Sequence, residues 1–117
     1  MRLARVVNET TGETLATHAE VAESFYDRLM GLQGRAGLPK GAGMVLAPTS
    51  SIHMFFMRFP IDAVFLDSAW RVMKVGRRLR PWTIGPFAPG ALYCVELPAG
   101  VAERTKPGHT VTLRSIE

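Results

Sequence analysis

The sequence is poor in cysteine and in long apolar runs. Its single cysteine, Cys94, excludes an intramolecular disulfide framework and any metal site built from several cysteines. No stretch approaches about 18 consecutive apolar residues, and the first residues lack the apolar core of a signal peptide. We therefore expect a soluble protein of the reducing cytoplasm that makes no contact with a membrane.

Acidic residues are in the minority. Ten Asp and Glu stand against 14 Lys and Arg, which gives a net charge of +4 over 117 residues. The hydrophobic content of 47% is that of an ordinary globular protein and excludes collagen-like and wholly disordered chains. A chain of this length can bury one core without help from metals or disulfides. The composition predicts a single domain over residues 1–117.

Short apolar runs separated by turn residues predict many short strands. Residues 3–7 and 14–21 flank a turn and predict a hairpin, and Ser24 is a typical N-cap for a short helix. Glycine and proline between residues 77 and 89 predict an extended loop, and one or two helical turns are expected over residues 98–106. Further strands are expected over residues 44–47, 51–57, 61–66, 70–75, 91–97 and 110–115. The fold class is therefore α+β and β-rich, with seven or eight strands in a partly closed barrel and one or two short helices.

The largest apolar side chains predict the core. The run 51–57 is apolar on both faces, so we expect an interior strand there. Across the chain, we expect Phe25, Leu29, Phe56, Phe65 and Val95 to be largely buried.

Several blocks together resemble one known family. They are Arg28-Leu29-Met30-Gly31-Leu32, Gly43-Met44-Val45-Leu46, the long run from Phe56 to Asp67, Val95-Glu96-Leu97-Pro98-Ala99-Gly100 and Lys106-Pro107-Gly108-His109. In this order and spacing the chain resembles the bacterial and archaeal family called domain of unknown function 192. The resemblance spans about Ala16 to Leu113. It implies a small β-rich, barrel-like fold and no established activity.

Charged residues inside apolar segments indicate a binding site. Glu96 lies in an otherwise apolar strand, so its carboxylate needs a partner, for which Arg28 or Arg58 is the candidate. An arginine beside carboxylates can bind an anion through its guanidinium, or it can form an internal ion pair. The first hypothesis is a non-catalytic binding domain, without cofactor or metal, for a small anionic ligand or a peptide. Its candidate residues are Arg28, His53, Phe56, Met57, Arg58, Asp62 and Glu96.

A second hypothesis rests on the basic residues that precede the proline-rich segment. Arg77, Arg78 and Arg80 lie next to Trp82, so they could contact phosphates while the indole stacks on a base. This pattern predicts weak binding of single-stranded nucleic acid. An ordinary solvated surface would give the same pattern.

A third hypothesis is an enzyme of unknown reaction. His53 could act as a general base with Asp62 or Glu96, provided that the side chains converge on one concave site. Cys94 lies in an apolar strand and is expected to be a small buried side chain. The sequence leaves open whether the protein is an enzyme, and it names no biological partner.

Overall fold

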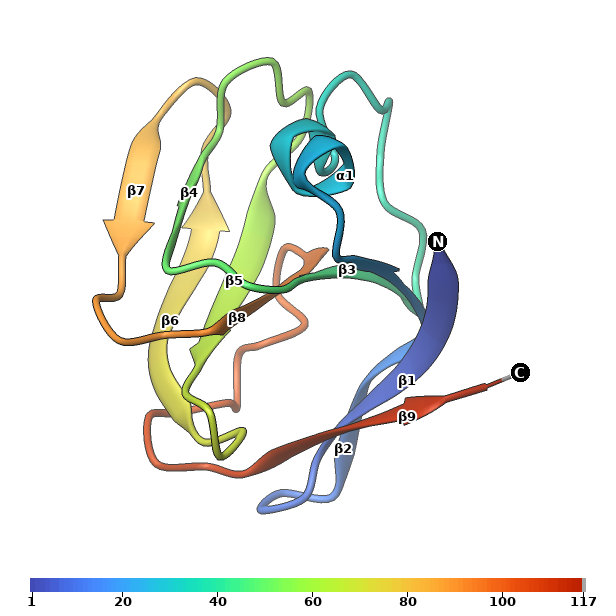
Figure 1. Ribbon diagram of the computed structural model, residues 1–117, viewed down its shortest axis with the longest axis vertical. Coiled ribbons are helices and arrows are strands. Elements are labelled where there is room, and N and C mark those ends of the chain that lie inside the picture. Colours follow the sequence, from blue (N-terminus) through green and yellow to red (C-terminus); the bar gives the residue numbers. More distant parts are fainter. Residues whose placement is uncertain (117) are drawn as a thin grey trace.

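The fold is built around one curled, seven-stranded sheet (Figure 1). The computed structural model describes residues 1–116, in which nine strands and one short helix are formed. The elements are β1 (Arg2–Asn8), β2 (Glu13–Ala22), α1 (Phe25–Met30), β3 (Ala42–Leu46), β4 (Ser51–His53), β5 (Ile61–Leu66), β6 (Val72–Leu79), β7 (Ile84–Phe87), β8 (Tyr93–Pro98) and β9 (Val111–Ser115).

The order of the strands in the large sheet is β6-β5-β8-β3-β2-β1-β9. Neighbours are antiparallel except β2 and β3, which are parallel. A bridge between Arg71 and Thr110 brings the start of β6 near the start of β9, so the sheet curls into a half-barrel. The predicted β-rich, partly closed barrel is confirmed in this form, although a single helix of six residues makes the label α+β a loose description.

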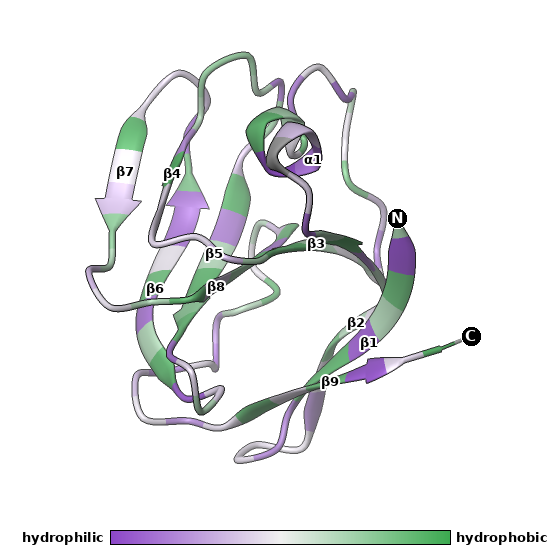
Figure 2. Cartoon of the chain, in the orientation of Figure 1, coloured by the Kyte–Doolittle hydropathy of each residue, from purple (hydrophilic) through white to green (hydrophobic). Residues whose placement is uncertain are grey.

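The two faces of the sheet carry separate apolar cores. Alternation along β5 and β8 sends Val64 and Val95 into one core and Phe65 and Cys94 into the other. Figure 2 shows hydrophobic residues along β3 and β8, which lie at the centre of the sheet. The second core faces α1 and the separate two-stranded ribbon formed by β4 and β7. The predicted burial of Phe65 and Val95 is confirmed.

The predicted cap of the helix is present. The hydroxyl of Ser24 accepts a hydrogen bond from the amide of Asp27 at 3.0 Å. Gly31 ends α1 with a φ of 46°, a conformation that favours glycine. The expected helical turns over residues 98–106 are hydrogen-bonded turns instead of a helix.

The prediction of an interior strand over residues 51–57 is wrong. β4 ends at His53 and pairs with β7 outside the large sheet, so its alternate side chains face solvent. The chain then turns, and Phe56 has a φ of 61° and a side chain that is 61% exposed. The prediction of a buried Leu29 is also wrong, because its side chain on α1 is 54% exposed. The prediction for the Phe25 side chain lies outside the part of the chain that the structure describes.

The predicted loop over residues 77–89 is also wrong. β6 extends to Leu79 and therefore includes Arg77 and Arg78, and β7 uses residues 84–87 despite Pro86. Proline is tolerated there because β7 lies in a two-stranded ribbon, where one edge needs no amide donors. Within residues 1–116, no helix is long and apolar enough to cross a membrane.

Candidate functional site

A cavity of about 240 Å³ opens between α1 with the turn that follows it and the segment that contains β4. Apolar side chains form most of its wall, from Leu29, Met30, Leu32, Leu46, Ile52 and Met57. Its polar lining comes from Arg28, Gln33, Thr49, Ser51, His53 and Glu96, with Gly31 completing the wall. A small, mainly apolar space with a few polar groups is typical of ligand sites in proteins.

Glu96 is the buried acid of this cavity. On β8 it lies opposite Met44 of β3 and Ala63 of β5, and its side chain is on the face that carries the second core. The residue is 5% exposed, and among the described residues its Oε1 atom has no hydrogen-bond partner. Burial raises the pKa of Glu96 to about 7, although the positive charge of Arg35 opposes the shift. The expected ion pair of Glu96 with Arg28 or Arg58 is absent from the described chain.

The cations near Glu96 are held by other groups. Arg28 lines the cavity from α1, and its guanidinium donates a hydrogen bond to the backbone carbonyl of Glu23. Arg35 pairs with Glu20, with 2.7 Å between Nη1 and Oε2. In the described part of the chain, Glu96 therefore forms no ion pair with either arginine.

His53 also lines the cavity, and it limits what acid–base chemistry is available there. Its Nδ1 atom accepts a hydrogen bond from the amide of Phe55 at 3.2 Å. A neutral imidazole in this position therefore carries its proton on Nε2, so Nδ1 is not free to donate to a carboxylate. His53 and Glu96 thus share the cavity, and only the Nε2 atom of a neutral His53 is free to donate to a carboxylate.

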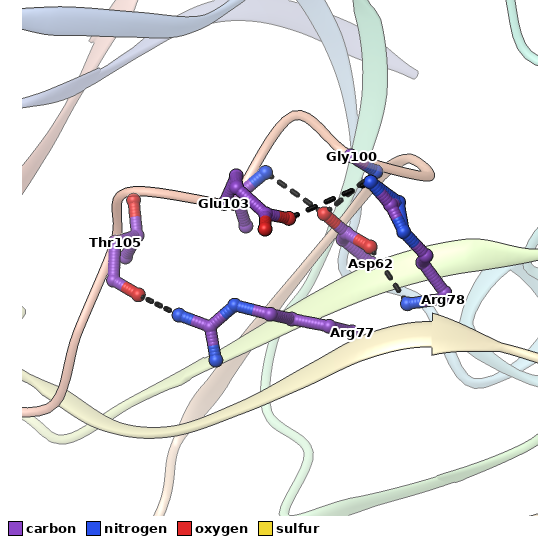
Figure 3. Close-up of polar contacts among 7 residues, drawn as sticks. Asp62, Arg77, Arg78, Gly100, Glu103 and Thr105 are labelled. Carbon is purple, nitrogen blue, oxygen red and sulfur yellow. Dashed lines mark hydrogen bonds and ion pairs between the residues drawn. The ribbon is translucent and has the colours of Figure 1, made fainter.

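Asp62 lies on the opposite face of the sheet from Glu96, since Ala63 is the residue that pairs with Glu96 on β5. Its Oδ1 atom accepts from the amide of Arg78, and its Oδ2 atom accepts from the amides of Gly100 and Ala102 (Figure 3). These bonds tie β5 to β6 and to the turn after β8. The structure therefore does not bring Asp62 together with His53. Asp62 is on the opposite face of the sheet from Glu96, and the carboxylate of Asp62 accepts hydrogen bonds from backbone amides.

Phe56 and Arg58 are both exposed and do not line the cavity. Phe56 instead joins an aromatic patch that we define as His53, Phe55, Phe56 and Trp82. Its ring centre lies 5.0 Å from that of Trp82, and the rings of His53 and Phe55 are 5.1 Å apart. Of the seven residues predicted for the binding site, the structure thus brings four to the cavity: Arg28, His53, Met57 and Glu96.

The basic residues of the nucleic-acid hypothesis separate into two groups. Arg77 donates to the carbonyl of Thr105, and Arg78 lies 3.6 Å from the carboxylate of Glu103 (Figure 3). Arg80 is exposed just beyond β6, two residues before Trp82, which is itself 60% exposed. Arg77 and Arg78 are also exposed, but each has a polar contact within the protein, whereas Arg80 and Trp82 lie together beyond β6.

Several residues of the cavity escaped the sequence analysis. Gln33, Thr49 and Ser51 lie in turns or at the start of β4, where polar residues are common and indicate nothing by themselves. Arg35 acts on Glu96 through its charge, from within a glycine-rich segment that predicted only a loop. Among the described residues, no cluster of three or more His, Cys, Asp or Glu side chains could hold a metal ion.

Comparison with known proteins identifies the family. The model of DUF192, described as "Uncharacterized ACR", matches residues 6–113. The chain belongs to this family. The resemblance stated from the sequence is thereby confirmed.

The matches cover most of the chain. A UPF0127 protein of Pyrococcus horikoshii is 36% identical over 107 residues, which are 87% of this chain and 90% of that protein. A UPF0127 protein of Thermococcus sibiricus is 33% identical over 102 residues, which are 84% of this chain but 66% of that relative.

Two solved structures share the DUF192 fold. A protein of unknown function from Novosphingobium aromaticivorans superimposes with a TM-score of 0.81 and 26% identity, over 94% of this chain and 83% of that one. A protein from Sinorhizobium meliloti, described as a putative transcription regulator, also gives a TM-score of 0.81, over 96% of this chain and 92% of that one. At 21% identity it shows the fold alone.

Proposed function

We propose that residues 1–117 act as one non-catalytic binding domain that takes a small molecule into the cavity between α1 and β4. The observation that carries this proposal is the buried Glu96 carboxyl group, which faces an apolar cavity and has no hydrogen-bond partner for Oε1 among the described residues. Buried polar atoms are nearly always paired in folded proteins, so an unpaired one beside an open space indicates a missing partner.

The size of the cavity sets the size of the ligand. An apolar cavity of roughly 150 Å³ accepts a molecule the size of benzene. A volume of about 240 Å³ therefore suits a compact molecule or a single side chain of a peptide. The cavity supports the small-ligand form of the predicted function in preference to an extended peptide.

The test is a screen of small aromatic and aliphatic fragments by NMR, read on the methyl groups of Met30 and Met57. Both side chains line the cavity, so fragments that enter it should shift their signals. Ser51→Trp should weaken this binding, because Ser51 lines the cavity and is exposed enough to accept a larger side chain. The matched control is Ser50→Trp at an exposed neighbour that does not line the cavity. Equal binding by both variants would refute the proposal.

A second candidate function is weak binding of single-stranded nucleic acid at the aromatic patch. It is supported by the exposed rings of Phe56 and Trp82 next to the exposed Arg80. Aromatic side chains beside a cation form the usual platform on which bases stack. The cytoplasmic location expected from the sequence remains a prediction and suits either function.

A further inference from the structure

Among the polar side chains that line the cavity, the buried ionisable one is that of an acid, Glu96. Glu96 comes from the centre of the sheet, and its Oε1 atom lies 3.7 Å from where a Cβ on Gly31 would be. Gly31 adopts a φ of 46°, so the position favours glycine, and a side chain there would contact the carboxyl group. Glu96 therefore belongs to the part of the cavity wall that the sheet forms.

The protein does not neutralise this acid with a direct ion pair. Among the described residues, Arg35 is paired with Glu20, and the bond recorded for the Arg28 guanidinium goes to the Glu23 carbonyl. A buried carboxylate without a cation is costly, and a cationic partner with hydrogens to donate would remove much of that cost. The missing partner of Oε1 is thus a donor, and most favourably a charged one.

We infer that the natural ligand carries an amine, amidine or guanidine group on a small apolar body, and that this cation binds Glu96 while the body contacts Met30, Leu46 and Met57. This inference rests on the proposed function, since it names the class of ligand for the same cavity. This ligand class differs from the anionic ligand expected from the sequence. The buried wall of the cavity carries the carboxyl group of Glu96, and the one arginine that lines the cavity lies on α1. An anionic ligand would be repelled by an ionised Glu96.

The test uses three matched probes: benzamidine, benzamide and benzoate. They have the same ring and nearly the same shape, and they differ in carrying a positive, zero or negative charge. Calorimetric titration at pH 8 should show that benzamidine binds at least about 10-fold more tightly than benzamide, while benzoate binds most weakly. Glu96→Gln should remove the preference for benzamidine over benzamide.

A pH series on the unaltered protein gives a second readout that needs no variant. Burial keeps Glu96 protonated below about pH 7, so a bound cation must displace that proton. Benzamidine should therefore bind several-fold more weakly at pH 5.5 than at pH 8, whereas benzamide should not change. The charged and titratable groups around Glu96 are Arg28 and His53 on the cavity wall, Arg35, and Cys94 on the same strand. A His53→Gln variant that keeps the pH effect assigns it to Glu96.

The outcomes separate this inference from the proposed function. Equal binding of benzamide and benzamidine at the methyl groups of Met30 and Met57 would overturn the cationic ligand and leave the binding domain intact. Tighter binding of benzoate, or no binding of benzamidine at millimolar concentration, would also overturn it. In those cases the fragment screen with Ser51→Trp and Ser50→Trp decides separately whether the cavity binds ligands at all.

Discussion

At the scale of single residues, Asp62 and Glu96 show two opposite uses of a buried carboxyl group. Asp62 is fully buried and accepts three hydrogen bonds from backbone amides, which join β5 to β6 and to the turn after β8. Glu96 is nearly as buried, but its Oε1 atom has no partner in the described chain. The first residue therefore stabilises the fold, and the second is kept at a cost to stability.

We predict that Asp62→Asn lowers the free energy of unfolding by about 2–4 kcal/mol. Both oxygens of Asp62 accept hydrogen bonds from backbone amides. In an asparagine, the NH₂ group takes the place of one oxygen and faces a backbone N–H. Two donors then face each other in a buried position, and neither has an acceptor. Denaturation in urea, followed by circular dichroism, measures the change.

Asp67→Asn is the matched control. Only the Oδ1 atom of Asp67 accepts the amides of Ala69 and Arg71, and Asn can supply an equivalent oxygen. Its effect should stay below about 0.5 kcal/mol. Similar losses in the two variants would contradict the role given to Asp62.

At the scale of elements, the turn after β4 and the turn before β7 present the aromatic patch together. The amide of Trp82 donates to the carbonyl of Met54, and the amide of Met54 donates to the carbonyl of Thr83, each at 2.7 Å. Phe56 and Trp82 both have positive φ angles, 61° and 67°, which are uncommon for bulky residues. Two paired turns therefore hold the aromatic rings outward at an energetic cost, which is common at functional surfaces.

If the aromatic patch binds single-stranded nucleic acid, we predict a dissociation constant of about 10⁻⁴–10⁻⁶ M that weakens as salt rises. Trp82→Ala should cost about 1–3 kcal/mol of binding free energy, because a base would lose its stacking partner. Arg80→Ser should also weaken binding. Fluorescence anisotropy of a labelled oligonucleotide at low salt measures both effects.

The control for this prediction is Arg104→Ser, which removes the same charge from another exposed position. A loss of affinity equal to that of Arg80→Ser would mean that only net charge attracts the oligonucleotide. Unchanged binding in Trp82→Ala would remove the stacking hypothesis. Arg77 and Arg78 are less suitable targets, since they also contact Thr105 and Glu103.

At the scale of the whole molecule, Glu96 makes stability depend on pH. Its pKa is raised from 4.5 to about 7 in the folded protein, so between these values the unfolded chain has released a proton that the folded protein retains. The contribution of Glu96 to stability is therefore greatest below about pH 4.5, falls as pH rises and levels off above about pH 7. The two pKa values differ by an amount equivalent to about 3 kcal/mol.

We predict that Glu96→Gln removes this dependence, because a glutamine does not ionise. The stability of the variant relative to the unaltered protein should rise by about 3 kcal/mol between pH 4.5 and pH 7.5. Urea denaturation of both proteins across this range measures the difference and cancels the other carboxylates. A constant difference would show that folding does not raise the pKa of Glu96.

The sequence predicts this fold best where local chemistry and burial agree. The first hairpin, the Ser24 cap and the buried Phe65 follow from turn residues, a hydroxyl and alternation. The sequence predicts burial and strand positions poorly at Phe56 and β7, where pairing outside the large sheet decides which side chains are exposed. An interior strand and an exposed ribbon can have the same apolar composition.

The residues of the candidate site could likewise be predicted only in part from the sequence. An acid in an apolar strand directed attention to Glu96, which the structure places on the cavity wall, but only the register of β5 with β8 shows that Asp62 is on the other face. Arg28 and Arg58 could not be placed relative to Glu96 from spacing, since helix and turn geometry decide where a long side chain reaches.

The position of β1 has a consequence for how the protein is made. β1 lies between β2 and β9, and residues 4–8 pair with residues 115–111. During synthesis, β1 can form its hairpin with β2 early, but one of its sides stays without a partner until β9, the last of the nine strands in chain order, leaves the ribosome. A nascent or truncated chain that stops before residue 111 therefore exposes an unpaired strand edge, and such chains should be the aggregation-prone form of this protein.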